Sequence, residues 1–64
     1  MVNVNGKSYD YANKNVCDVL DALKLNADLV VVEVNRSIVS KALYAEVVLK
    51  EDDHVEVVQF VGGG

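Results

Sequence analysis

The chain has 64 residues and a mass of 7.0 kDa, so it can form no more than one small domain. Apolar residues make up 52% of it and charged residues 25%, which excludes a disordered chain and predicts a folded one. Ten Asp and Glu against six Lys and Arg give a net charge of −4, which repels phosphate backbones and anionic lipid and so argues against nucleic acid or a membrane as a partner.

The first predicted element is a β-hairpin. Val2 and Val4 alternate with polar residues, Asn5-Gly6 supplies the two positive φ angles of a type I′ turn, and the alternation resumes over residues 7–11. A two-residue loop places Val2 opposite Tyr9. The core face of the hairpin is therefore expected to carry Val2, Val4, Tyr9 and Tyr11.

An amphipathic helix follows. Apolar residues recur at the i, i+3, i+4, i+7 spacing, at Val16, Val19, Leu20 and Leu23. Asn15 stands where an N-cap is needed, and Asp18 three residues later complements the positive end of the helix. The predicted helix runs from Val16 to about Leu25.

The second half of the chain is rich in strand signals. Residues 29–34 form a dense apolar run, and the position of Glu33 makes Val30, Val32 and Val34 the buried set. A turn at residues 35–37 leads into a short strand, Ile38–Val39, and then into an irregular segment over residues 40–45. Residues 46–50 and 55–61 are two further strand candidates, on either side of the turn at residues 51–54.

The predicted order, β-β-α-β-β-β, is that of an α+β domain with one helix packed across a mixed sheet. Fifteen valines support this content of sheet, because β-branched residues favour strands. If the first and last strands lie side by side at the centre, the arrangement is a β-grasp. We expect this domain to cover residues 1–61 and residues 62–64 to form a flexible glycine tail.

Residues suited to catalysis are scarce. The chain has one His and one Cys, whereas acid–base or nucleophilic catalysis needs a nucleophile, a base and a group that orients them. A lone Cys17 excludes a disulfide, a thiolate zinc site and a four-cysteine iron–sulfur cluster. A helix N-terminus can activate a thiol, but we interpret Cys17 as a small apolar residue beside the buried helix face. His54 lies among carboxylates whose spacing fits neither zinc nor calcium loops, so no metal site is expected.

The cellular setting can be predicted from what the chain lacks. No apolar run approaches the ~20 residues that cross a bilayer, and the first residues do not have the basic-then-apolar layout of a signal peptide. We therefore expect a cytoplasmic protein that is a monomer when alone.

The C-terminal glycines are the main functional signal. Gly62, Gly63 and Gly64 follow a predicted strand directly and carry no side chain, so they can enter a channel too narrow for other residues. There the terminal carboxylate can meet the α-phosphate of a nucleotide and form an acyl adenylate, which makes the chain a substrate of a partner enzyme. The alternative is that the glycines are only a frayed end.

The last predicted strand adds a docking surface to this tail. Period-2 alternation puts Glu56, Val58 and Phe60 on one face. If Glu56 marks the solvent side, Val58 and Phe60 form an exposed apolar pair that leads into the tail. Such a pair next to a flexible terminus indicates a partner-binding site.

Over essentially its whole length the chain resembles the sulfur-carrier proteins of thiamin biosynthesis, which are small ubiquitin-like β-grasp proteins. The resemblance rests on residues 2–7, 16–23 and 32–39 and above all on residues 53–64, which end in Val61-Gly62-Gly63-Gly64. Many members have a Pro after the Ile-Val pair and a Gly in the turn before the last strand, where this chain has Ser40 and Asp52. Asp tolerates the left-handed region better than most residues, and losing the Pro is expected to loosen the loop.

The resemblance implies a carrier rather than an enzyme. Gly64 would be adenylated with ATP by an activating enzyme, converted to a thiocarboxylate with sulfur drawn from cysteine by a desulfurase, and discharged to thiazole synthase. Gly63 and Gly62 would complete the tail motif, and Val58 and Phe60 would face the partners. Two alternatives stay open: the small subunit of molybdopterin synthase, with the same tail chemistry, and a β-grasp module that binds non-covalently and has an inert tail.

Overall fold

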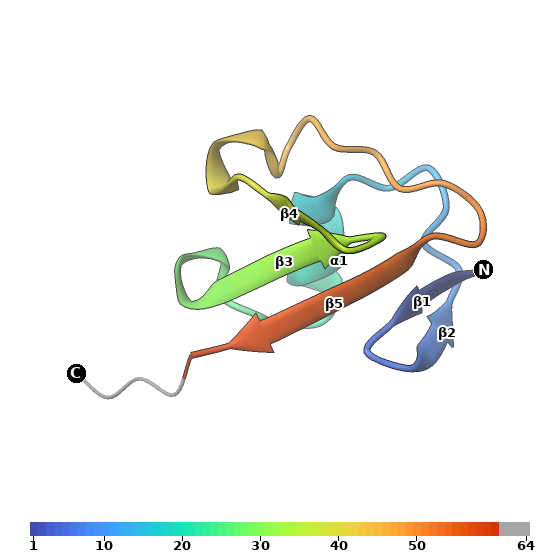
Figure 1. The fold of residues 1–64 in the computed structure, drawn as a ribbon, viewed down its shortest axis with the longest axis horizontal. Helices are drawn as coiled ribbons and strands as arrows, with labels where there is room; N and C mark the ends of the chain where they lie inside the picture. The colour runs from blue at the N-terminus through green and yellow to red at the C-terminus, as the bar shows by residue number, and fades with distance from the viewer. Residues whose placement is uncertain (61–64) are drawn as a thin grey trace.

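The computed structural model describes residues 1–60, which form one helix and a five-stranded sheet (Figure 1). The elements in chain order are β1 (Val2–Val4), β2 (Lys7–Tyr9), α1 (Val16–Ala22), β3 (Val30–Val34), β4 (Ser37–Val39) and β5 (His54–Gln59). The order across the sheet is β2-β1-β5-β3-β4, and β5 pairs parallel with β1 and antiparallel with β3. The first and last strands therefore lie side by side at the centre, which confirms the predicted β-grasp arrangement.

The opening hairpin has the predicted turn and register. Asn5 and Gly6 have φ angles of 51° and 88°, as a type I′ turn requires, and Val2 pairs with Tyr9. Val2 is fully buried, whereas Tyr9 and Tyr11 are only partly buried. Their rings stack with centroids 4.8 Å apart, and Tyr11 lies beyond the end of β2. The face predicted for these tyrosines is therefore right, but they cover the edge of the core instead of entering it.

Helix α1 begins as predicted. The side chain of Asn15 accepts a hydrogen bond from the backbone N–H of Asp18 at 2.8 Å, so it caps the helix N-terminus. Val16, Val19 and Leu20 are buried against the sheet.

The helix ends earlier than the expected Leu25. Lys24 takes a φ of +58°, and the N–H of Leu25 donates to the carbonyl of Leu20 at 2.9 Å. These are the features of a Schellman motif, which stops a helix by forming a left-handed residue just after its end. Glycine usually fills that position, so Lys24 gives no sequence signal for the stop.

The core lies between α1 and one face of the sheet. Val30 and Val32 of β3 are buried as predicted, but Val34 is only partly buried at the end of that strand. The buried cluster consists of Val2, Val4, Val16, Val19, Leu20, Val30, Val32, Tyr44, Leu49, Val55 and Val57. Within residues 1–60, no helix covers the opposite face of the sheet (Figure 1).

The predicted strand over residues 46–50 is wrong. This segment does not join the sheet and instead follows the chain that leads into α1. The N–H of Val16 donates to the carbonyl of Val47 at 3.1 Å, and the N–H of Leu49 donates to the carbonyl of Lys14 at 2.9 Å. An isolated bridge joins Asn15 to Val48. Burial of the Leu49 side chain fixes the segment there, because it closes the core beside the start of the helix.

The last strand begins one residue before its predicted start. His54, expected in the turn, is the first residue of β5, and Asp52 occupies the left-handed region at a φ of 68°. Asp52 therefore adopts the left-handed conformation at a position where many members of the family that the chain resembles have glycine, as expected for a residue that tolerates it. The predicted end of the strand, Val61, lies outside the described residues. Among residues 1–60 no helix is long and apolar enough to cross a membrane.

Candidate functional site

The candidate site begins with the alternation of side chains along β5. Val55 and Val57 are 2% and 8% exposed and face α1, whereas Val58 is 57% exposed on the other face of the sheet. Phe60 follows the strand and is 54% exposed, and its N–H donates to the carbonyl of Leu29 at 2.7 Å. Val58 and Phe60 are thus both exposed, as the alternation predicts.

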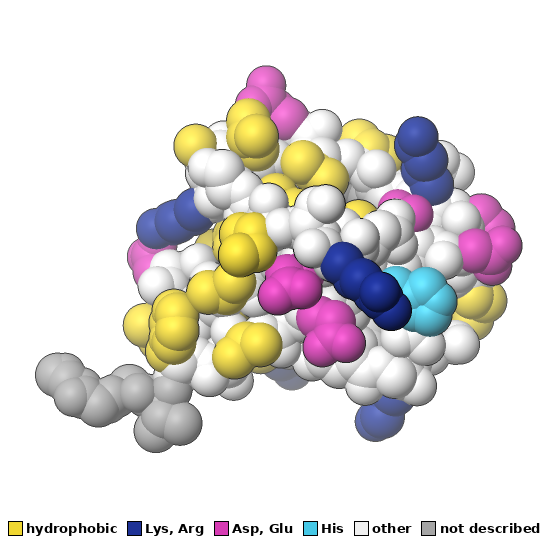
Figure 2. Space-filling model, viewed as in Figure 1, with side chains coloured by type: hydrophobic (Ala, Val, Ile, Leu, Met, Phe, Trp, Pro, Cys, Tyr) yellow, Lys and Arg dark blue, Asp and Glu magenta, His cyan; other side chains and the backbone are white. Residues whose placement is uncertain are grey.

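An apolar patch surrounds these two residues. Val31 of β3 is directly opposite Val58, and Leu29 is hydrogen-bonded to Phe60. We call this set, Leu29, Val31, Val58 and Phe60, the apolar patch. Figure 2 shows hydrophobic side chains gathered on this face toward the end of β5. Exposed apolar groups so close together are typical of a protein-binding surface.

Two asparagine side chains hold β5 in place, one on each side. On the β1 side, the Asn5 amide accepts a hydrogen bond from the N–H of Val57 at 2.8 Å and donates one to its carbonyl at 3.0 Å. The Asn5 side chain thus supplies an acceptor and a donor to β5 just beyond the last backbone bond of the short parallel β1–β5 ladder, in which the Asn5 N–H donates to the carbonyl of Val55. On the β3 side, Asn35 accepts from the N–H of His54 at 2.9 Å and donates its own backbone N–H to the carbonyl of His54 at 2.7 Å.

Both asparagines are the first residue of a hairpin turn with positive φ, 51° at Asn5 and 50° at Asn35. Both residues were predicted to lie in turns, but their contacts with β5 were not predicted. The signal in the sequence is that an Asn begins each of these short turns. The two contacts hold β5 at its first residue, His54, and at its fourth, Val57, and the pairing of Gln59 with Val30 holds its far end.

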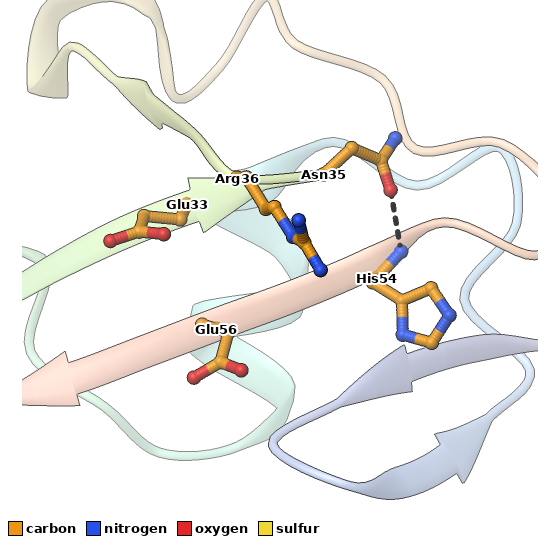
Figure 3. Close-up of a pocket in the computed structure, with 5 residues that line it drawn as sticks. All are labelled: Glu33, Asn35, Arg36, His54 and Glu56. Carbon is orange, nitrogen blue, oxygen red and sulfur yellow. Dashed lines mark hydrogen bonds between the residues drawn. The ribbon is translucent and has the colours of Figure 1, made fainter.

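A shallow hollow of about 400 Å³ lies on the exposed sheet face, between the apolar patch and the start of β5 (Figure 3). It is lined by Glu33, Asn35, Arg36, His54 and Glu56. Glu33 and Glu56 are directly opposite each other in the β3–β5 ladder. The two ion pairs found among residues 1–60 join the N-terminal amine to Glu51 and Lys41 to Asp28, so neither carboxylate of the hollow is paired there. This hollow could not be predicted from the sequence, because its residues come from two strands and a turn.

The remaining candidate residues are dispersed. Cys17 is a free, partly buried thiol on α1, across the sheet from Val58 and Phe60. In the described part of the chain, no group of three or more His, Cys, Asp or Glu side chains is arranged to hold a metal ion. Gly62, Gly63 and Gly64 lie outside the described residues.

Comparisons with known proteins point in one direction. The model of the ThiS family matches residues 2–64. The sulfur carrier protein ThiS of Bacillus subtilis is 38% identical over 66 residues, which cover 100% of both chains. A thiazole synthase of Magnetococcus marinus is 39% identical over 64 residues that cover 98% of this chain, which spans only about a fifth (20%) of that protein.

The structure comparison agrees. The crystal structure of a thiamine biosynthesis protein, ThiS, from Geobacter metallireducens has 36% sequence identity and a TM-score of 0.78. The match covers 98% of this chain and 97% of that one.

Proposed function

The chain belongs to the ThiS family, and we propose that it is the sulfur carrier of a thiamin pathway, with Gly64 as the residue that carries the sulfur. The family expected from the sequence is thereby confirmed, and the chain is a carrier rather than an enzyme. The observation that carries the proposal for Gly64 is structural. The central strand β5 is held on both sides, and it is the strand that leads into the sequence Val61-Gly62-Gly63-Gly64.

The proposed chemistry takes place at the terminal carboxylate. One carboxylate oxygen of Gly64 attacks the α-phosphorus of ATP, pyrophosphate leaves, and an acyl adenylate forms. A persulfide-derived sulfur then attacks the carbonyl carbon and AMP leaves, because adenylation has turned a poor electrophile into a good one. The product is an acyl disulfide between the carrier and the donor protein. A thiol of the donor protein then attacks the donor-side sulfur, so that the S–S bond breaks, a disulfide forms within the donor, and the carrier leaves as a thiocarboxylate. Gly63 and Gly62 serve this chemistry by having no side chain to obstruct a narrow channel.

The carrier needs partners that supply the catalytic groups. We propose an activating enzyme that uses ATP, a cysteine desulfurase that provides sulfur indirectly, and thiazole synthase as the acceptor. Two thiazole synthases that contain a region similar to nearly the whole of this chain support the last of these. The chain itself needs no bound cofactor in this scheme, and the cytoplasm is the proposed site of the reaction.

Val58 and Phe60 are the proposed partner-binding residues. They lie on the exposed face of the sheet, within the apolar patch, at the end of the strand that precedes the tail. A partner that covers this patch would therefore be positioned to receive the tail. Burial of two such side chains typically contributes several kcal/mol, about 1.5–3 kcal/mol each when burial is complete.

Intact-mass analysis tests the proposal. The protein is incubated with ATP, the activating enzyme of the same pathway and a sulfur donor, and its mass is measured. Charging should appear as the replacement of one terminal oxygen by sulfur, after a labile adenylate. An unchanged mass would instead support the module with an inert tail.

The acceptor is tested with the charged protein. Offered to thiazole synthase and, separately, to the large subunit of molybdopterin synthase, the thiocarboxylate should be consumed only by thiazole synthase. Preferential discharge to the molybdopterin enzyme would replace the thiamin assignment by the alternative, since fold and tail are common to both pathways.

A further inference from the structure

The exposed sheet face changes in chemistry along the strands. The rows of paired residues across β3 and β5 start with the apolar pair Val31–Val58 and continue with the acidic pair Glu33–Glu56. Adjacent rows on one face are two residues apart along each strand, which is a distance of about 7 Å. The pair Glu33–Glu56, which we call the acidic row, therefore lies next to the apolar patch and lines the side of the hollow nearest to it (Figures 2 and 3).

The acidic row is costly for the isolated domain. Like charges directly opposite each other destabilise a sheet. Arg36 also lines the hollow, but among residues 1–60 it forms no ion pair with either carboxylate. A carboxylate pair without an ion-pair partner in the described chain, in a concave surface next to exposed apolar residues, is complementary to a protein surface that carries a cation.

We propose that Glu33 and Glu56 bind a Lys or Arg side chain of the activating enzyme, which enters the hollow while the apolar patch covers an apolar surface beside it. This inference rests on the proposed function, and it names the residues by which the activating enzyme recognises the carrier before adenylation. Among the partners, the activating enzyme has the chemistry that fits. It must bring the anionic Gly64 carboxylate to the anionic phosphates of ATP, and this requires cationic groups around the tail channel.

The net charge of the carrier supports the same partner. A chain of net charge −4 is steered toward a positive surface, and a carboxylate pair fixed on the sheet orients the encounter. The orientation matters because the apolar patch lies at the end of β5 that precedes the tail in the sequence, so the rows of β5 set how far the bound cation lies from that end.

The test compares the variant Glu33→Gln/Glu56→Gln with the variant Asp21→Asn/Glu46→Gln. Both change the net charge equally, but Asp21 lies on α1 and Glu46 follows the 3₁₀ turn Lys41–Leu43, and both are exposed. Two readouts are used: binding to the activating enzyme without ATP, by calorimetry, and kcat and KM for pyrophosphate release. Each is measured over a range of salt concentrations.

The Glu33→Gln/Glu56→Gln variant should raise Kd and KM about tenfold at low salt, as expected for two exposed charge pairs, with kcat unchanged. The salt dependence of binding should become shallower than that of the wild type. The same variant should also melt a few degrees higher, about 2–5 °C, because the like-charge opposition is removed. If Glu33 and Glu56 served only to stabilise the fold, their replacement could not make the protein more stable while it weakens binding to the activating enzyme.

Kd, KM and salt dependence equal to those of the Asp21→Asn/Glu46→Gln control would overturn the inference. Failure of the proposed function looks different, because then the wild type itself releases no pyrophosphate. The calorimetric arm still decides the inference in that case, since it needs neither ATP nor charging.

Discussion

At the scale of single residues, the position of β5 depends on side chains that bond to its backbone. Asn5 is separated from Val57 by 52 positions in the sequence, yet its amide bonds to both the N–H and the carbonyl of Val57. β1 is only three residues long, so this single amide is a large part of its contact with β5.

The variant Asn5→Gly tests this contact. Glycine keeps the positive φ of the turn, so the change removes the amide without straining the backbone. Loss of two partly buried hydrogen bonds should lower the free energy of unfolding by about 2 kcal/mol. For a domain of this size the melting temperature, followed by circular dichroism, should fall by about 8–16 °C.

Asn13→Gly is the matched control. Asn13 also has a positive φ, 73°, and the described residues give its side chain no hydrogen bond. This control should stay within about 0.5 kcal/mol of the wild type. Equal melting temperatures for the two variants would show that the Asn5 amide does not hold β5.

At the scale of elements, β5 has one buried face, which stabilises the fold, and one exposed face, which we assign to partner binding. Val57 points into the core and Val58, the next residue, points into the apolar patch. Adjacent positions in one strand can therefore be assigned opposite roles, and substitutions there test the assignment with little else changed.

Val57→Asp should unfold the domain, because it buries an unpaired charge in the core. Val58→Asp should leave the melting temperature within a few degrees of the wild type, while it weakens binding to the activating enzyme and to thiazole synthase. Circular dichroism and calorimetry measure the two effects. If Val58→Asp is as destabilising as Val57→Asp, the exposed patch has a structural role and its assignment to partner binding is wrong.

The loop after β4 offers a stabilising change. Ser40 has φ −62° and ψ 136°, which is the conformation that proline prefers, and its side chain makes no capping bond to the 3₁₀ turn Lys41–Leu43. Ser40→Pro should therefore raise the free energy of unfolding by about 0.4–1 kcal/mol, by restricting the unfolded chain. Urea denaturation measures it. A lower midpoint would mean that the Ser40 N–H or the preceding residue cannot accommodate the ring.

The elements that could be predicted are those whose bounds are set by residues close by in the sequence. The Asn5-Gly6 turn fixes the hairpin register, and Asn15 marks the start of α1, because turn and cap residues act within a few positions. The end of α1 and the fate of residues 46–50 were not predictable in this way. Lys24 is not the glycine that usually marks a helix end. Val47 and Val48 have strand propensity, but this segment bridges the chain before α1 instead of joining the sheet.

The site could be predicted only in part, for a related reason. Side chains alternate between the two faces of β5, and the charged Glu56 marks the exposed face. Val58 and Phe60 could therefore be predicted to be exposed. The hollow combines Glu33 of β3 with Glu56 of β5, and their opposition depends on the register between two strands. That register is set by turns and packing elsewhere in the fold, which a single strand does not reveal.

At the scale of the whole molecule, the parallel pairing of β1 and β5 separates the N-terminus from the functional end. Asn3 pairs with His54, and the carbonyl of Met1 accepts the N–H of Asp52 at 2.9 Å, so the N-terminus lies beside the start of β5 (Figure 1). The far end of β5 is about 20 Å away along the strand. The two ends of the chain should therefore differ in how they tolerate additions.

A short N-terminal extension should leave charging unchanged. It breaks at most the exposed ion pair between the N-terminal amine and Glu51, which contributes little. One residue added after Gly64 should abolish charging and leave the melting temperature unchanged. Intact-mass analysis measures the first effect and circular dichroism the second. Full charging of the C-terminally extended protein, without prior trimming, would falsify the assignment of Gly64.

The central place of β5 also has a consequence for how the protein is made. Without β5 the sheet falls into two separate hairpins, β1–β2 and β3–β4, which share no hydrogen-bonded edge. A ribosome adds residues from the N-terminus, so both hairpins emerge before the strand that joins them, and the pairing of β1 with β5 spans nearly the whole chain. The sheet can therefore be completed only after β5 has been synthesised. A chain that stops before β5 cannot complete the core and remains open to proteases, so the folded protein excludes molecules that lack the strand leading to the proposed site of charging.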